Sequence, residues 1–166
     1  MAGHTRIAVI GVGNEFRRDD GVGWAVVDRL RGRAVRRPLP AGTVLDVCDG
    51  DPGRLIGLWE GVGLAVVVDA AHAHPGKPGR VHRIELDSGW LNQPPTTSSH
   101  GMGLGEAVEL SRVLGRLPGR LVVYAVEVGD SSLGTAMSGA VAGVVDPLAA
   151  SVEDEIAHYS DAVAQG

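Results

Sequence analysis

The hydrophobic positions of the chain form short apolar runs that alternate with stretches of helical spacing. Four runs have the length and β-branched content of buried strands, at residues 7–10, 43–48, 64–68 and 121–126. Residues 80–86 instead alternate between polar and apolar side chains, which predicts a half-exposed, antiparallel edge strand. Helical spacing is found in five stretches, at residues 24–30, 52–59, 101–114, 137–145 and 147–159.

This order of elements predicts an α/β fold. We expect a three-layer sandwich with a mostly parallel sheet of about five strands, one of them antiparallel, and helices on both faces. A length of 166 residues predicts a single domain over residues 1–166. Asp146 is expected to cap the last helix and Pro147 to open it. In the helix at 101–114 we expect Leu104, Val108 and Leu110 on the apolar side. The pattern does not predict the order of the strands.

Composition narrows the class of protein. The apolar content is 44% and the charged content 21%, which is ordinary for a globular protein. No apolar run has the length of a membrane span and no signal segment is visible, so we expect a cytoplasmic protein without a membrane partner. A net charge of −5 without a basic stripe argues against a nucleic-acid partner. The single cysteine, Cys48, excludes an internal disulfide and a cysteine-based metal cluster.

The loop after the first strand carries the first candidate chemistry. Residues 11–14, Gly-Val-Gly-Asn, begin like a dinucleotide-binding fingerprint, but Phe16 stands where the third glycine belongs. Asp19 and Asp20 then precede the helix, where they would repel a pyrophosphate. A single acid suffices to cap a helix, and two acids beside a glycine-lined loop also suit a cation.

Three residues are candidates for one site at the carboxyl edge of the sheet. Asp20 follows the first strand, Asp69 ends the third, and His100 stands at the start of the helix at 101–114. Ligands bind at this edge in open α/β sheets. A helix N-terminus disfavours imidazolium, and a metal requires neutral imidazole. Two carboxylates and one imidazole without a thiolate do not suit a soft metal, and three protein ligands leave positions open for chemistry.

Other polar residues near this edge have simpler interpretations. Asp19 is expected to act as a capping or supporting acid, and turn roles are expected for Asp49 and Asp51. His72 and His74 follow Asp69 in a proline-bearing loop, where we expect solvent exposure and no ligand role. Cys48 is expected to be a packed strand residue, because no paired base identifies it as a nucleophile.

Residues 11–14 together with Asp19-Asp20-Gly21-Val22-Gly23 resemble the opening of the hydrogenase maturation proteases. The resemblance continues through the apolar strand into Asp69 and through Ser98-Ser99-His100-Gly101-Met102-Gly103-Leu104, and it extends from about Arg6 to Val126. It implies that Asp20, Asp69 and His100 bind nickel and form the catalytic site. Some family members have glutamate where Asp20 stands.

The resemblance also implies a substrate and a reaction. The expected partner is the precursor of the nickel–iron hydrogenase large subunit, which already carries nickel. The expected activity is endopeptidase cleavage of its C-terminal extension, with the nickel supplied by the substrate. The rival hypotheses are a zinc-type hydrolase that holds its own metal, a non-enzymatic nickel-binding maturation factor, and a nucleotide-binding module.

Overall fold

The computed structural model describes residues 6–14, 16, 18–73, 75–86, 102–129, 134 and 137–166. The strands are β1 (Ile7–Val12), β2 (Thr43–Cys48), β3 (Leu64–Ala71), β4 (Val81–Leu86) and β5 (Arg120–Glu127). The helices are the 3₁₀ turn η1 (Arg18–Gly21), α1 (Val22–Ala34), α2 (Pro52–Trp59), α4 (Met102–Leu114), α5 (Gly139–Ala142) and α6 (Val145–Ala164).

The five strands form one sheet in the order β2-β1-β3-β5-β4. The pairs β1–β2, β1–β3 and β3–β5 are parallel, and β4 pairs antiparallel with β5 at the edge. The predicted α/β fold class, with one antiparallel strand, is therefore confirmed. β1 and β3 lie in the interior of the sheet and are buried along almost their whole length, as their continuous apolar runs require.

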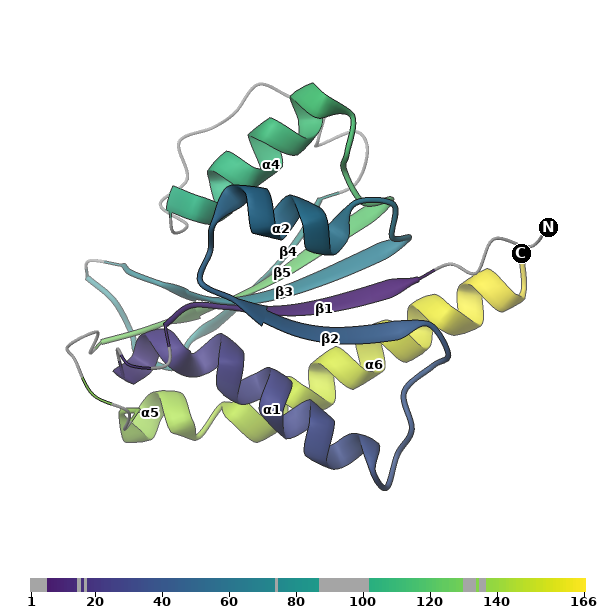
Figure 1. Cartoon of the computed structure of the whole chain (residues 1–166). Helices are drawn as coiled ribbons and strands as arrows, with labels where there is room; N and C mark the ends of the chain where they lie inside the picture. The colour runs from purple at the N-terminus through teal and green to yellow at the C-terminus, as the bar shows by residue number, and fades with distance from the viewer. Residues whose placement is uncertain are drawn as a thin grey trace.

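Helices cover both faces of the sheet (Figure 1). On one face, α1 and α6 enclose a core that includes Val9, Val66 and Val122. On the other face, α2 and α4 enclose a second core that includes Ile10, Val67 and Val123. Because neighbouring side chains in a strand point to opposite faces, β1, β3 and β5 contribute to both cores.

The helix predicted over residues 52–59 has these bounds in the structure, and the turn residue before it also caps it. Asp51 caps α2 by accepting a hydrogen bond from Arg54 N at 3.0 Å, and Pro52 takes the first helical position. The predicted start of the last helix, with Asp146 as its cap and Pro147 as its first residue, is wrong, because α6 begins at Val145 and both residues lie inside its first turn. The Asp146 side chain instead forms an ion pair with Arg29 of α1. Where a helix was expected over residues 137–145, the short α5 is followed by a turn at residues 143–144, and α6 begins at Val145.

The apolar side of α4 also differs from the prediction. Leu104 and Ala107 are buried, but Leu110 is 42% exposed and the next buried position is Ser111. Ser111 lies seven positions after Leu104 and so on the same face of the helix, where its hydroxyl accepts a hydrogen bond from the buried indole Nε1 of Trp59 at 2.9 Å. A buried indole N–H needs an acceptor, and Ser111 supplies one on the inward face of α4.

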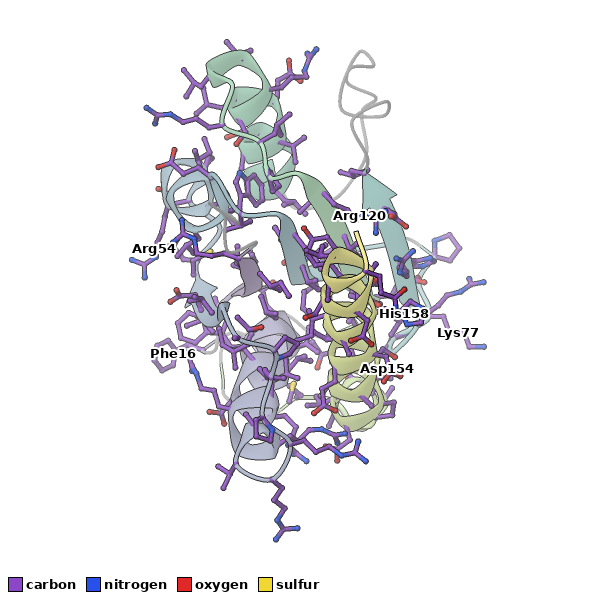
Figure 2. The ribbon with its side chains drawn as sticks, turned by 90° about the vertical axis from the view of Figure 1, so that its right-hand side faces the viewer. Phe16, Arg54, Lys77, Arg120, Asp154 and His158 are labelled. Atoms are coloured by element: carbon purple, nitrogen blue, oxygen red, sulfur yellow. The ribbon has the colours of Figure 1, made fainter. Side chains whose placement is uncertain are left out.

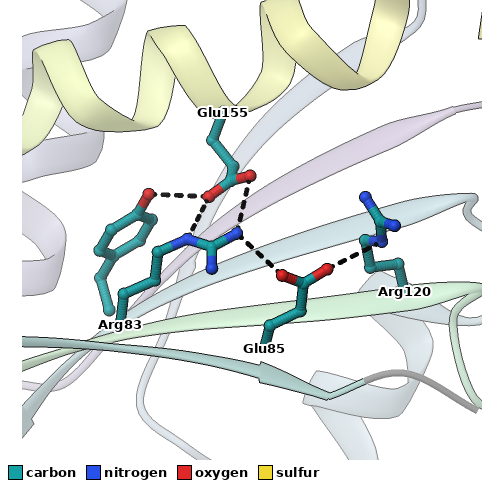
Figure 3. Close-up of polar contacts among 5 residues, drawn as sticks. Arg83, Glu85, Arg120 and Glu155 are labelled. Atoms are coloured by element: carbon teal, nitrogen blue, oxygen red, sulfur yellow. Dashed lines mark hydrogen bonds and ion pairs between the residues drawn. The ribbon is translucent and has the colours of Figure 1, made fainter. Parts of the chain in front are cut away.

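A network of charged side chains fastens the edge strand β4 to α6 (Figure 3). Arg83 donates to both carboxylate oxygens of Glu155, at 2.7 and 3.0 Å. Tyr124 donates to the same carboxylate at 2.9 Å, and Glu85 bridges Arg83 to Arg120. Bidentate arginine–carboxylate pairs have strong geometric preferences. The network therefore holds the edge strand in a defined position against the helix layer.

The part of the chain that the structure describes contains no helix of the length and apolarity that a bilayer crossing demands.

Candidate active site

Asp20 and Asp69 come together at the carboxyl edge of the parallel strands. Asp20 lies in η1, the next element after β1, and Asp69 lies near the end of β3, which pairs with β1. The two carboxylates are close enough that the negative charge of Asp20 contributes to raising the pKa of Asp69. Two of the three residues predicted for the site therefore share one location.

Close backbone packing fixes the segment that carries Asp20. A Cβ atom on Gly23 would lie 2.4 Å from the carbonyl oxygen of Val68, and one on Gly13 would lie 2.0 Å from that of Asp20. Gly13 also has a φ of +145°, a backbone conformation that residues with a side chain rarely adopt. These glycines are required because the loop after β1 and the start of α1 pack directly on the backbone of β3 and η1.

Asn14 closes the loop around Asp20. Its backbone N–H lies 3.2 Å from both the carbonyl oxygen and Oδ2 of Asp20. Its side-chain Oδ1 accepts a hydrogen bond from Phe16 N at 2.9 Å. The Phe16 ring is 60% exposed and projects away from the sheet (Figure 2). The motif at residues 11–14 therefore serves to position a carboxylate, and Phe16 stands where a dinucleotide-binding loop needs its third glycine.

Asp19 has a supporting role, as predicted, but the role is not that of a helix cap. Its side chain is fully buried and accepts hydrogen bonds from Gly129 N, Ser138 N and Ser138 Oγ. The N-cap position of α1 is Gly21, which makes no side-chain cap. Asp19 thus fastens η1 to the segment that follows β5.

Burial sets the electrostatics of Asp69. The residue is 8% exposed, and desolvation raises its pKa to about 7, with a smaller upward contribution from the Asp20 charge. A hydrogen bond of 2.8 Å from Ala70 N to Oδ1 opposes this shift. In the absence of a cation, Asp69 is therefore partly protonated near neutral pH.

His72 lies closer to Asp20 than the sequence predicts. Its Nε2 is 4.0 Å from Asp20 Oδ1, and its side chain is 48% exposed. The exposure agrees with the prediction, but the proximity to a site carboxylate was missed. The two small apolar residues after Asp69 could have indicated this proximity. They continue β3 through Ala71, so His72 lies at the edge of the sheet.

The third predicted member, His100, lies outside the described residues, as does His74. α4 begins at Met102, two positions after His100, and packs against α2 on one face of the sheet. Asp69 is two positions beyond Val67, a residue of the core beneath these helices, and so belongs to the same face. Within the described ranges, no group of three histidine, cysteine, aspartate or glutamate side chains is arranged to hold a metal ion.

The remaining candidates have structural roles. Asp49 Oδ1 accepts a hydrogen bond from Asp51 N at 3.1 Å, so both acids shape the turn after β2, as predicted. Cys48 is 3% exposed, and burial raises the pKa of its thiol. A buried, protonated thiol is a poor nucleophile, which agrees with its predicted packing role.

Comparison with known proteins identifies the family. The family model described as hydrogenase maturation protease matches residues 36–155, a range that contains Asp69 and His100 but begins after Asp20. No curated protein sequence matches the chain.

Solved structures share the fold. The hydrogenase maturating endopeptidase HybD from E. coli is 21% identical, covers 93% of each chain and has a TM-score of 0.72. The [NiFe] hydrogenase maturation protease HybD from Thermococcus kodakarensis is 22% identical over 91% of this chain and 99% of its own, with a TM-score of 0.69. HycI, a second such protease from the same organism (strain KOD1), is 23% identical over 92% and 93%, with a TM-score of 0.65. On the family match, which spans well over half of its length, this chain belongs to the hydrogenase maturation protease family.

Proposed function

We propose that this peptidase removes the C-terminal extension of a nickel-loaded hydrogenase large-subunit precursor, and that Asp20, Asp69 and His100 contact the nickel. The observation that carries the proposal is the meeting of the Asp20 and Asp69 carboxylates at the sheet edge of a hydrogenase maturation protease. The nickel belongs to the substrate and arrives with it.

The raised pKa of Asp69 supports a low affinity of this site for free metal ions. Its pKa of about 7 means that a free cation competes with a proton at neutral pH. The carboxylate oxygens are also poor partners for a borderline ion compared with thiolates. A precursor that holds nickel through cysteines therefore brings an ion that this protein does not collect by itself. Cleavage then reports that nickel insertion has taken place.

Peptide hydrolysis needs an electrophilic carbonyl and an activated water. An ion held between the precursor and these carboxylates polarises the scissile carbonyl as a Lewis acid. Two routes to the attacking water fit the site: a water on the ion, or a water that hands its proton to one of the carboxylates. In both routes Asp20 and Asp69 must be ionised when the substrate is bound, and the cation itself favours that state.

A side-by-side digestion tests the proposal. Precursor from nickel-replete cells and precursor from nickel-starved cells are each incubated with the purified protein. The metal content of the purified protein and of both precursors is measured, and the masses of the products are determined by mass spectrometry. We expect cleavage of the nickel-loaded precursor alone and little nickel in the purified protein. Equal cleavage of both precursors would favour a self-metallated zinc-type hydrolase. Nickel binding without cleavage would favour a non-enzymatic maturation factor.

A further inference from the structure

An open groove of about 670 Å³ begins beside the candidate active site. Its residues come from the end of β3, the end of β5 and the first part of β4. The lining includes Ala71 and His72, which follow Asp69, and Ala125, whose small side chain leaves room above the sheet. The groove is therefore continuous with the edge where Asp69 and Asp20 lie.

The sheet register sets the length of the groove. Asp69 on β3 pairs with Ala125 on β5, and Ala125 pairs with His82 on β4. The three residues stand in one row, and two strand spacings separate Asp69 from His82, about 10 Å. An extended peptide covers this distance with about three residues. If the scissile bond of a bound peptide lies at Asp69, the residue about three positions from that bond therefore lies at His82.

The far end of the groove carries Arg80, His82 and one carboxylate. Glu127 is the carboxylate there, and its side chain is 7% exposed. It is already engaged, because its oxygens lie 2.7 Å from His82 Nε2 and 3.1 Å from Lys77 N. Arg80 Nε is 3.9 Å from Glu127, and the Arg80 side chain is 63% exposed, so its guanidinium can reach a second carboxylate. The Lys77 side chain extends outward beyond the β4 side of the molecule (Figure 2).

The two ends of the groove therefore differ in charge. The end at Asp20 and Asp69 suits a cation, and the exposed Arg80 guanidinium at the other end suits a carboxylate. We propose that this groove binds the first residues of the departing C-terminal extension and that Arg80 recognises a carboxylate about three residues beyond the scissile bond. The inference rests on the proposed function, which places the metal-bearing side of the precursor at Asp69. The residues beyond the bond then lie over Ala125.

A charge swap tests the inference. The cognate nickel-loaded precursor is digested by the wild-type protein and by Arg80→Glu, with kcat and KM measured separately. We expect Arg80→Glu to raise KM at least fivefold with a smaller change in kcat, because the variant alters binding remote from the scissile bond. For the wild-type protein, an acidic residue placed at about the third position of the extension should give a lower KM than lysine placed there, and Arg80→Glu should reverse this order.

Matched variants separate the outcomes. Arg37→Glu makes the same charge change at an exposed residue outside the groove and should leave KM unchanged. Arg80→Gln removes the charge with less perturbation if Arg80→Glu unfolds. Extension peptides with an amidated terminus, or with the acid replaced by its amide, distinguish a terminal carboxylate from a side chain. Equal KM values for Arg80→Glu, Arg80→Gln and Arg37→Glu would overturn the inference. No cleavage by the wild-type protein would instead overturn the proposed function.

Discussion

Ser138 donates two hydrogen bonds to Asp19 across 119 positions of sequence, from its N–H at 2.7 Å and from its hydroxyl at 2.9 Å. Gly129 N adds a third donor at 3.2 Å. These bonds join η1, which carries Asp20, to the segment that follows β5. The position of a site carboxylate therefore depends on its buried neighbour.

Asp19→Ala should lower the free energy of unfolding by about 2–4 kcal/mol, because buried donors would lose their acceptor. Ser138→Ala removes only the hydroxyl bond and should cost about 1 kcal/mol. Urea denaturation measures both, with the exposed Asp28→Ala as a control expected to stay within about 0.5 kcal/mol. An Asp19→Ala protein as stable as Asp28→Ala would show that these bonds do not fasten η1.

Gly23→Ala should destabilise the protein by about 2–4 kcal/mol, because its Cβ would lie 2.4 Å from the carbonyl oxygen of Val68. Gly32 lies on the same helix, and a Cβ added there would meet no described neighbour within 4 Å. Gly32→Ala should therefore stabilise the protein by about 0.5–1 kcal/mol through helix propensity. Thermal unfolding of the two variants compares them directly, and changes of the same sign would contradict the packing argument.

Asp69→Asn should change how stability depends on pH. The native state raises the pKa of Asp69 to about 7, so it keeps a proton that the unfolded chain releases near pH 4. The contribution of Asp69 to the free energy of unfolding therefore falls as pH rises from about 4 to 7 and then levels off. Asparagine carries no such proton, so the variant should gain up to about 4 kcal/mol relative to the wild type by pH 8.

Urea denaturation of metal-free protein between pH 4.5 and 8 measures this difference, with Asp28→Asn as a control whose curve should parallel the wild type. We also expect Asp69→Asn to lose processing activity, since asparagine lacks the charge that a cation needs. Parallel stability curves for Asp69→Asn and the wild type would refute the raised pKa.

His100→Ala should abolish processing while the fold stays intact, because His100 is proposed to contact the substrate nickel. His72→Ala should reduce processing only partly, since His72 lies 4.0 Å from Asp20 and is half exposed. Precursor cleavage and circular dichroism on both variants measure activity and folding. Normal cleavage by a folded His100→Ala protein, with loss of cleavage in His72→Ala, would transfer the role of imidazole ligand from His100 to His72.

The sequence by itself determined the elements and the family resemblance. The apolar runs at residues 7–10 and 64–68 predicted interior strands, and the alternation at residues 80–86 predicted the antiparallel edge strand. Such patterns are readable because each strand or helix imposes its own period on the chain. The placement of Asp20 and Asp69 at one sheet edge was also predictable, because parallel strands end at the same edge.

Only the tertiary structure decided which neighbours each side chain meets. The strand order, the bonds of Asp19 to Ser138, the approach of His72 to Asp20 and the row from Asp69 to His82 all join distant parts of the chain. Leu110 was misassigned because Ser111, at helical spacing from Leu104, takes the inward position and bonds Trp59. Asp146 was misassigned because α6 begins one residue earlier, at Val145. Local patterns record the period of an element, whereas these pairings depend on how the elements pack against one another.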